Sequence, residues 1–409
     1  MRRRDPETLI VAAATLAAFA TGPGQSWVVS VFVDSIIAGT GLTRIGVSTL
    51  YAIATGLSAA FAVLAGRLAD RHGPRRMILG TAAGLGVACV VMGGSAGPAS
   101  VLLGFAGLRV LGQGALPVGV AILIANWFVR TRGRAMAIVG LGYAASSAVL
   151  PPAARWLIDA AGWRGAWIVL GTVVWALVLP AVALAVRNRP EDLGVRPGGA
   201  GDPSERGPAS GAEDRRASRP GSPVLTTAAF WMLAVSLAVP ALVLTALFFH
   251  QTALFAERGL SAAVAAAAFV PYAVASVPAT LLAGVLVDRI GPRAVLVGNL
   301  GVLSIAVASL VVVADPISAA AYAAVLGISG GVQPVAVGVT GAHYYGRHGL
   351  GRVQGPAAMV VAIGAALGPL PLAIAHRLTG GYGGGLAALV VLAVGCGTMV
   401  ALARIPDAR

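Results

Sequence analysis

Lysine is absent from this chain of 409 residues, and all 29 of its basic side chains are arginine. Charged residues of any kind make up only 11% of the chain, roughly half the share of an ordinary soluble domain. A nucleotide-binding loop of the Gly-x-x-x-x-Gly-Lys type requires a lysine, so the chain contains no ordinary ATPase motor. The exclusive use of arginine, together with abundant Ala and Gly, indicates genomic base composition rather than a chemical requirement.

Cysteine is scarce as well. The two cysteines, Cys89 and Cys396, lie within apolar runs, which predicts buried thiols rather than a disulfide or a metal site. We therefore expect no metal and no cofactor. The net charge of +14 would suggest nucleic acid as a partner of a soluble protein. Here the placement of the arginines gives a better explanation, so no nucleic-acid partner is expected.

Long apolar runs dominate what the sequence does contain. Hydrophobic residues make up 57% of the chain, and about twenty consecutive apolar residues cross a bilayer as a helix. Pro and Gly recur within the runs, which membrane helices tolerate because their neighbours satisfy the freed backbone groups. The pattern predicts an all-α membrane protein with 12 transmembrane helices, near residues 9–35, 45–67, 77–95, 99–126, 135–157, 165–187, 226–252, 262–287, 294–313, 317–341, 354–375 and 385–404.

The arginines predict the orientation of these helices. With the N-terminus inside, 23 arginines fall on cytoplasmic ends and loops, five fall on the outer side, and Arg109 alone lies within a span. This asymmetry follows the positive-inside rule and places both termini in the cytoplasm, as expected for a multi-pass protein of the cell membrane. The N-terminal Arg2–Arg4 and the apolar run after it imitate a signal peptide, but eleven further spans favour a first transmembrane helix.

A charged segment occurs twice along the chain. Residues 66–75 and 284–293 are 218 positions apart and share seven of ten residues, and residues 117–120 resemble 334–337 at nearly the same offset. Parallel repeats of this kind predict two six-helix bundles, 1–187 and 224–409. The polar segment 188–223 is predicted to be a flexible cytoplasmic linker, with a regulatory or interaction role as the alternative. A monomer is expected.

These motifs resemble the major facilitator superfamily. The Gly-x-Leu-x-Asp-Arg-x-Gly-x-Arg turn appears twice, and Arg109–Ala115 is similar to the family's fourth-helix arginine motif. The resemblance implies a secondary transporter rather than an enzyme, with helices 1, 4, 5, 7, 8, 10 and 11 around a central cavity open alternately to each side. A narrower resemblance, to bacterial monocarboxylate-transporter-like and oxalate/formate-exchanger-like members, rests on residues 22–26, 30–34, 127–128, 132–135 and 189–194.

The narrower resemblance implies a monocarboxylate-type organic anion as substrate, with protons as a candidate coupling ion and lipids as neighbours. Members of that subgroup commonly hold a basic residue in helix 8, where this chain has Thr280, and helix 11 has no Lys or Arg between Val353 and Ala375. Binding then depends on Arg109, His250 and neutral donors, or the substrate is not anionic. The alternative is a proton-coupled efflux carrier for an amphipathic or cationic compound. A membrane enzyme of lipid metabolism is disfavoured because the spans contain no paired carboxylates or His/Asp cluster.

Arg109 is the costliest residue to place in a membrane, at about 2.5–3.5 kcal/mol on insertion scales. It should face the interior and bind a backbone carbonyl, a polar neighbour such as Gln113, or an anion; a structural role and ligand contact are equally open. His250 is expected to bind substrate, take a coupling proton, or form an ordinary hydrogen bond near the outer interface. Asp34 is expected to cap the outer end of helix 1. The predicted substrate-binding residues are Gln25, Trp27, Arg109, Gln113, Tyr143, His250, Tyr272 and Gln333.

The repeated turn lies where helices 2 and 8 reach the inner surface. Its charges are predicted to hold the two bundles together when the transporter opens outward, whereas topology alone is the alternative explanation for its arginines. The aromatic pair Trp127-Phe128 is expected at the level of the lipid headgroups. The predicted gating residues are Asp70, Arg71, Arg75, Asp288, Arg289 and Arg293.

Overall fold

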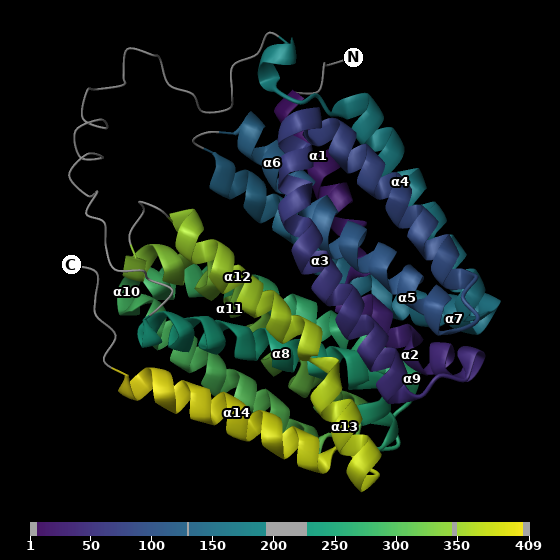
Figure 1. The fold of residues 1–409 in the computed structure, drawn as a ribbon, viewed down its shortest axis with the longest axis vertical. Helices are drawn as coiled ribbons and strands as arrows, with labels where there is room; N and C mark the ends of the chain where they lie inside the picture. Colours follow the sequence, from purple (N-terminus) through teal and green to yellow (C-terminus); the bar gives the residue numbers. More distant parts are fainter. Residues whose placement is uncertain (1–5, 129–130, 194–226, 346–349, 404–409) are drawn as a thin grey trace.

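The computed structural model describes residues 6–128, 131–193, 227–345 and 350–403, all of them in helices or short connections (Figure 1). Nine stretches of this described part are long and apolar enough to span a membrane. Two of the nine, Arg132–Ala185 and Ala262–Val312, run through a glycine with non-helical angles, Gly162 or Gly291, so each holds two spans. Together with the 29-residue helix Arg44–His72, they give the twelve spans that the sequence predicts.

The first bundle is built from α1 to α7. Its second half-span, α2, is separated from α1 by a short 3-10 turn, and its fourth span contains a π-helix between two α-helical parts. The elements are α1 (Pro6–Phe19), η1 (Gly22–Gly24), α2 (Ser26–Thr40), α3 (Arg44–His72), α4 (Pro74–Gly93), α5 (Pro98–Gly107), η2 (Leu108–Ala115), α6 (Leu116–Trp127), α7 (Arg132–Ala185) and η3 (Pro190–Leu193).

The second bundle repeats this plan from α8 to α14. Its last-but-one span is interrupted at Gly368-Pro369, where Gly368 keeps helical backbone angles, unlike the 3-10 turn that breaks the first span of the chain. The elements are α8 (Ala228–Ala256), α9 (Ala262–Ala267), α10 (Phe269–Ser309), η7 (Leu310–Val312), α11 (Pro316–Tyr345), α12 (Leu350–Leu367), α13 (Pro369–Thr379) and α14 (Gly383–Leu402).

Each bundle has its own apolar core, and the two bundles meet along one half of their length. In Figure 1 they lie together near α2, α9 and α13 and spread apart toward the end at which α1 begins and α14 ends. We call that end the inner end, after the predicted orientation, and the opposite one the outer end. Across the interface α2 packs on α8, α3 on α12 and α13, and α7 on α9 and α10. Phe249 and Ala266 of the second bundle pack within the core of the first.

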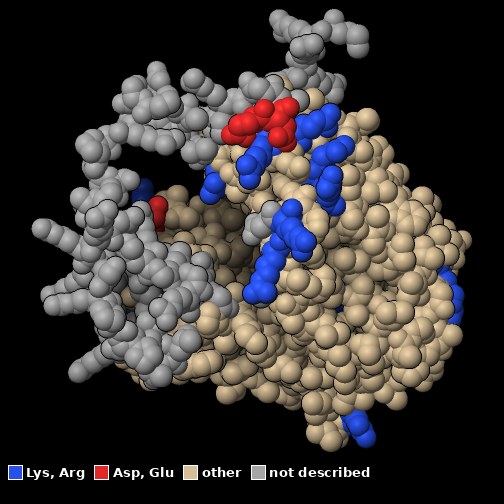
Figure 2. All heavy atoms as spheres, turned by 45° about the horizontal axis from the view of Figure 1, so that its top comes forward, with Lys and Arg blue, Asp and Glu red and all other residues tan. Residues whose placement is uncertain are grey.

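At the inner end the divergence leaves a hollow between the bundles. Figure 2 looks onto this end and shows the hollow with arginine side chains gathered beside it. The first bundle contributes exposed arginines here, including Arg67, Arg71, Arg76 and Arg134. This arrangement is open toward one face and closed toward the other, which is the geometry a carrier adopts on one side of its cycle.

One expectation about an individual residue was wrong. Helix α2 continues past residue 35 to Thr40 and ends at Gly41 in the left-handed region, so Asp34 lies inside the helix and does not cap it. Its carboxylate instead accepts a hydrogen bond from Arg44 at 2.5 Å. Trp127 ends α6 and is fully buried within the protein, where its indole N–H donates to the carbonyl of Arg187 in the segment after α7. Its position at the level of the lipid headgroups stays a prediction.

The predicted buried thiols are confirmed. Cys89 and Cys396 are both free and buried.

The linker was predicted over residues 188–223. Its first residues pack on the first bundle: the amide of Arg75 donates to Asn188 Oδ1 at 3.1 Å, and η3 follows directly. Residues 194–223 lie outside the described part of the chain.

Candidate functional site

The first span is interrupted in the middle of the first bundle. Gly22, Pro23 and Gly24 form the 3-10 turn η1, and α2 restarts at Ser26 with Gln25 at its N-cap position. A break between two helix segments leaves backbone carbonyls without intrahelical partners. At membrane depth such groups need a partner from a neighbouring helix. The carbonyl of Gly24 is one that finds such a partner.

A second irregularity, the π-helix η2, faces this break. A Cβ on Gly24 would overlap the carbonyl of Leu108 and lie 2.6 Å from the Cα of Gly112. A Cβ on Gly112 would lie 2.8 Å from the Cα of Gly24. Both positions therefore require glycine, because the two backbones touch directly. π-helical turns occur rarely and are frequent at functional sites.

Arg109, in the first turn of η2, connects the two irregular segments. Its side chain is completely buried; its Nη1 donates to the carbonyl of Gly24 at 2.8 Å and its Nε donates to Thr55 Oγ1 at 3.0 Å. The guanidinium lies 4.7 Å from the centroid of the Tyr51 ring, within range for a cation–π interaction. Of the three partners expected for Arg109, a backbone carbonyl, a polar neighbour or an anion, the structure shows the carbonyl of Gly24. Thr55 and Tyr51, both on α3, were missed.

Hydroxyl groups extend this network across three spans. The hydroxyls of Tyr51 and Ser26 are 2.8 Å apart, and Ser58 donates to the backbone carbonyl of Arg109 at 2.8 Å. Within the described part of the chain no carboxylate lies within 4.0 Å of Arg109, and its Nη2 has no hydrogen-bond partner. The site is therefore a buried positive charge held by neutral groups, with no acidic counter-charge among them.

Four of the other predicted residues lie in the first bundle, and one of them, Trp27, reaches the interface. Trp27 packs against the cores of both bundles, and its buried indole N–H has no described partner. Gln113 shares the π-helix with Arg109, and its buried Oε1 is also without a described partner. Tyr143, on α7, is half-buried against the first core. Gln25 is buried at the start of α2.

The predicted residues of the second bundle are mostly engaged with their own bundle. Gln333 donates to the carbonyl of Leu237 at 2.7 Å. Thr280 donates to carbonyls of its own helix and of Gly331, both at 2.9 Å. A Cβ at Gly330 would overlap the hydroxyl of Tyr272, so that ring fills the space beside α11. These contacts support packing roles, whereas His250, described below, keeps one ring nitrogen free.

The repeated turn has the same hydrogen bond in both bundles. Arg75 Nη2 donates to the carbonyl of Ala183 at 2.8 Å, and Arg293 Nη2 donates to the carbonyl of Ala401 at 2.7 Å. Donor and acceptor are both displaced by 218 residues, so the duplication extends to the contact itself. Each arginine thus binds carbonyls at the C-terminal end of the sixth helix of its own bundle, where a cation is favourable.

The remaining predicted gating residues are less constrained in this conformation. Arg71, Asp288 and Arg289 are exposed at the inner ends. The side chain of Asp70 lies outside the described residues. With the inner ends apart, the proposed contacts between bundles cannot be observed here, and the gating role stays a prediction.

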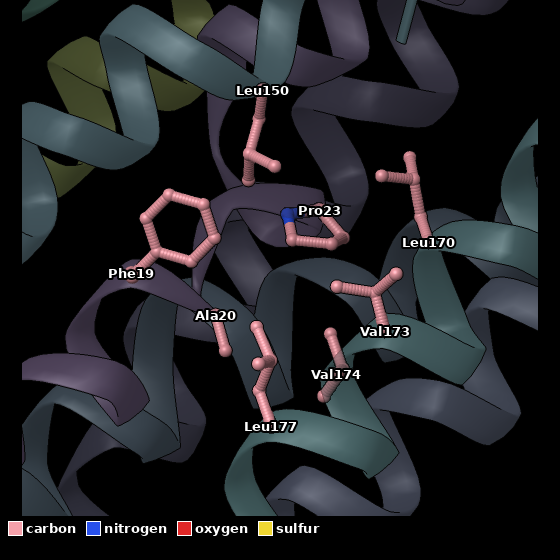
Figure 3. A pocket seen from close by; sticks show the side chains of 8 residues that line it. All are labelled: Phe19, Ala20, Pro23, Leu150, Leu170, Val173, Val174 and Leu177. Atoms are coloured by element: carbon pink, nitrogen blue, oxygen red, sulfur yellow. The ribbon is translucent and has the colours of Figure 1, made fainter. Parts of the chain in front are cut away.

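A cavity lined only by apolar groups lies behind the broken first span (Figure 3). Figure 3 shows Pro23 of η1 surrounded by side chains from α1 and α7. Its lining offers no hydrogen-bond donor to a polar solute, so it is not a candidate site for an anion. The lining residues are Phe19, Ala20, Pro23, Leu150, Leu170, Val173, Val174 and Leu177.

Two apolar six-helix bundles, the first of which holds a buried cationic site, have the architecture of a multi-pass membrane transporter. The sequence profile of the Major Facilitator Superfamily matches residues 14–369, and the chain belongs to that family. Known members of the fold resemble it over nearly its whole length. A bacterial homologue of the human lysosomal transporter Spinster, inward-facing and unoccupied, superposes with a TM-score of 0.73 at 18% identity over 97% of this chain and 96% of that one. A D-xylose-proton symporter gives a TM-score of 0.70 at 16% identity, covering 98% and 99%.

One curated relative is similar in sequence over part of the chain. It is a probable sulfoacetate transporter of Cupriavidus necator, 33% identical over 123 residues. The alignment covers 29% of this chain and 28% of that protein. The family and these neighbours identify a transporter rather than an enzyme.

Proposed function

We propose that this transporter moves a small organic anion of the monocarboxylate type across the cytoplasmic membrane by alternating access, with both chain termini in the cytoplasm. The observation that carries the proposal is the state of Arg109: a completely buried guanidinium with no carboxylate near it in the described chain and one nitrogen without a partner. A buried charge normally has a counter-charge. Since the protein supplies none at this site, the substrate is the natural source.

The positive charge of Arg109 attracts an anionic substrate even when the two are not in contact. Two unit charges about 8 Å apart attract by about 2 kcal/mol at an effective dielectric constant near 20. In this conformation the Arg109 side chain is closed off from solvent, so direct contact with substrate requires α1, α2 and η2 to separate. The relative from Cupriavidus necator supports the same substrate class, because sulfoacetate is a small organic anion.

A thermal-shift assay on the purified protein tests the proposal. Acetate, lactate, oxalate and sulfoacetate are compared with tetraphenylphosphonium as an amphipathic cation. A ligand at a hundred times its Kd stabilises by about 2.7 kcal/mol. We expect at least one of the anions to raise the Tm of the wild type. The effect should be weaker in Arg109→Lys, which keeps the charge but not the forked geometry, and absent in Arg109→Gln.

Arg134→Gln is the matched control, because Arg134 is exposed at the inner end and its charge should not affect the site. Stabilisation by tetraphenylphosphonium alone would contradict the anion proposal and favour the efflux carrier. Equal anion stabilisation in wild type and Arg109→Gln would remove Arg109 from substrate recognition. The wild-type screen alone decides between anion and cation if Arg109→Gln does not fold.

A further inference from the structure

His250 lies in the outer half of α8 with its side chain completely buried. Its Nε2 is 2.8 Å from the carbonyl oxygen of Pro369, at the start of α13. A carbonyl only accepts hydrogen bonds, so Nε2 carries the proton of the neutral ring and Nδ1 carries the lone pair. Nδ1 is buried and has no hydrogen-bond partner in the described chain.

An unpartnered buried lone pair is unusual, because most buried polar atoms are satisfied. On imidazole this lone pair is also the basic one, the position that a proton takes up. Two aromatic rings lie beside the imidazole, Phe249 at 5.3 Å and Tyr382 at 5.4 Å between ring centroids, and neither makes a hydrogen bond to Nδ1. Nothing in these contacts occupies Nδ1, so the site is available to a proton.

Two titratable rings, Tyr382 and His376, form a row from His250 toward the outer end. The Tyr382 ring lies between His250 and His376, 4.7 Å from the latter, and the Tyr382 hydroxyl is buried with no described partner. His376 is in the last turn of α13 and is half-exposed. These two rings lie in line between the outer end and His250.

Charged groups of the first bundle act on this row of rings at the closed outer end. Burial raises the pKa of Tyr382 to about 12, Arg44 acts in the opposite direction, and Asp34 and Glu257 add to the rise. The charges that act on the His250 ring come from Arg44 of the first bundle and His376 of its own. The titratable and charged groups in and around this row of rings are Asp34, Arg44, Tyr51, Glu257, His376 and Tyr382.

Ring contacts also connect the His250 site to the Arg109 site across the interface. Phe249, beside His250, contacts the Tyr51 ring at 4.8 Å between centroids, and Arg109 lies over that ring at 4.7 Å. His250 and Arg109 are thus joined by two intervening rings, one from each bundle. A change at either end alters the packing of the contact that keeps the outer end closed.

We infer that Nδ1 of His250 is the proton-binding site of this transporter, and that proton binding there opens the outer contact between the bundles. The imidazolium would be a positive charge near Arg44 of the first bundle, whose pairing with Asp34 reduces but does not remove the repulsion between the two cations. A buried ionised ring is also costly, whereas water reaches it once the bundles part. Both effects favour the outward-open conformation at acidic outer pH. The coupling to anion transport depends on the function proposed above, whereas the proton site itself does not.

The test measures opening without any substrate. In a Cys89→Ser, Cys396→Ser background, Ala266→Cys places a reporter at a residue of α9 buried in the first bundle's core, and Ala263→Cys places its control on the exposed side of the same helix. Purified protein in lipid nanodiscs is labelled with a maleimide from pH 8 to pH 5. The ratio of the two labelling rates removes the intrinsic pH dependence of thiol chemistry.

We expect this ratio to rise by up to about tenfold as pH falls, the limit for a proton bound tenfold more tightly by the open conformation. His250→Gln should abolish the rise, and His72→Gln, at an exposed histidine of the inner end, should preserve it. A ratio that does not change with pH in the wild type would overturn the inference whether or not the variant folds. So would a rise that persists in His250→Gln. An anion screen that fails leaves both results intact, so the two proposals fail separately.

Discussion

The ring of Tyr51 on α3 meets the ring of Phe249 on α8 at a centroid distance of 4.8 Å, joining the first bundle to the second. Tyr51 is completely buried and also lies beneath Arg109, so the ring that binds the cation is the ring that closes the interface. The buried cationic site and the outer closure therefore share a residue. This relationship leads to the first prediction.

Phe249→Ala should weaken outer closure. Truncating a buried Phe costs about 3–5 kcal/mol, and here the loss falls on the closed conformation because the ring packs in the opposite bundle's core. Labelling of the Ala266→Cys reporter, relative to Ala263→Cys, should increase at neutral pH. Phe255→Ala is the control, since Phe255 packs within its own bundle against Tyr322. Equal labelling in both variants would show that the ring contact does not hold the closed state.

Gly24→Ala should destabilise the protein, because a methyl group there would overlap the backbone of η2. Overpacking of this kind costs about 1–3 kcal/mol. Gly140→Ala is the matched control: a Cβ at Gly140 meets no atom within 4 Å, and replacing Gly within a helix gains about 0.5–1 kcal/mol. Thermal unfolding of the purified variants should give Tm shifts of opposite sign. A Gly24→Ala variant as stable as the wild type would show that the two spans can separate freely.

Thr55→Val should weaken the Arg109 site without altering its charge. The substitution removes the acceptor of the Nε hydrogen bond, and a hydrogen bond to a charged group contributes about 1.5–3 kcal/mol. We expect a lower Tm and a smaller stabilisation by whichever anion proves active. Thr172→Val serves as control, since its hydroxyl is exposed and bonds only to its own helix at Ile168. Matching Tm losses in the two variants would argue that Thr55 has no particular role.

The two glycines of the repeated turn should respond differently to alanine. Gly73 and Gly291 both have positive φ, at 80° and 82°, a region nearly restricted to glycine, so both variants carry strain of about 1–3 kcal/mol. A Cβ at Gly73 would in addition lie 2.6 Å from Asn188 Oδ1, whereas one at Gly291 meets nothing within 4 Å. Gly73→Ala should therefore lower the Tm more than Gly291→Ala. The reverse order would show that Asn188 yields without cost.

Much of the architecture was predictable because apolar length and the repeated turn are local signals. The identity of the Arg109 partners was not predictable, although a backbone carbonyl was one of the three kinds of partner expected. Gly24 is 85 residues away in sequence, and Thr55 is a hydroxyl within an apolar run, so no local pattern marks either. Only the requirement that a buried guanidinium be satisfied could have directed attention to the hydroxyls of α3.

Other partners were out of reach of sequence reasoning for the same physical reason. The carbonyl that accepts the indole N–H of Trp127 belongs to Arg187, 60 residues later. For Asp34 the sequence did contain a signal, because Gly41 is a residue suited to end a helix in the left-handed region. Its pairing with Arg44 follows once the helix is extended to Thr40.

The hydrogen bonds described above all stay within one bundle, and the named contact across the interface is between rings. A swing of one bundle against the other thus breaks none of the hydrogen bonds described. What resists the swing is dispersion between carbon surfaces, which has little angular preference but loses about a quarter to a half of its strength over a gap of about 0.5–1 Å. Closure therefore depends on direct contact between the apolar surfaces and is lost over a short separation.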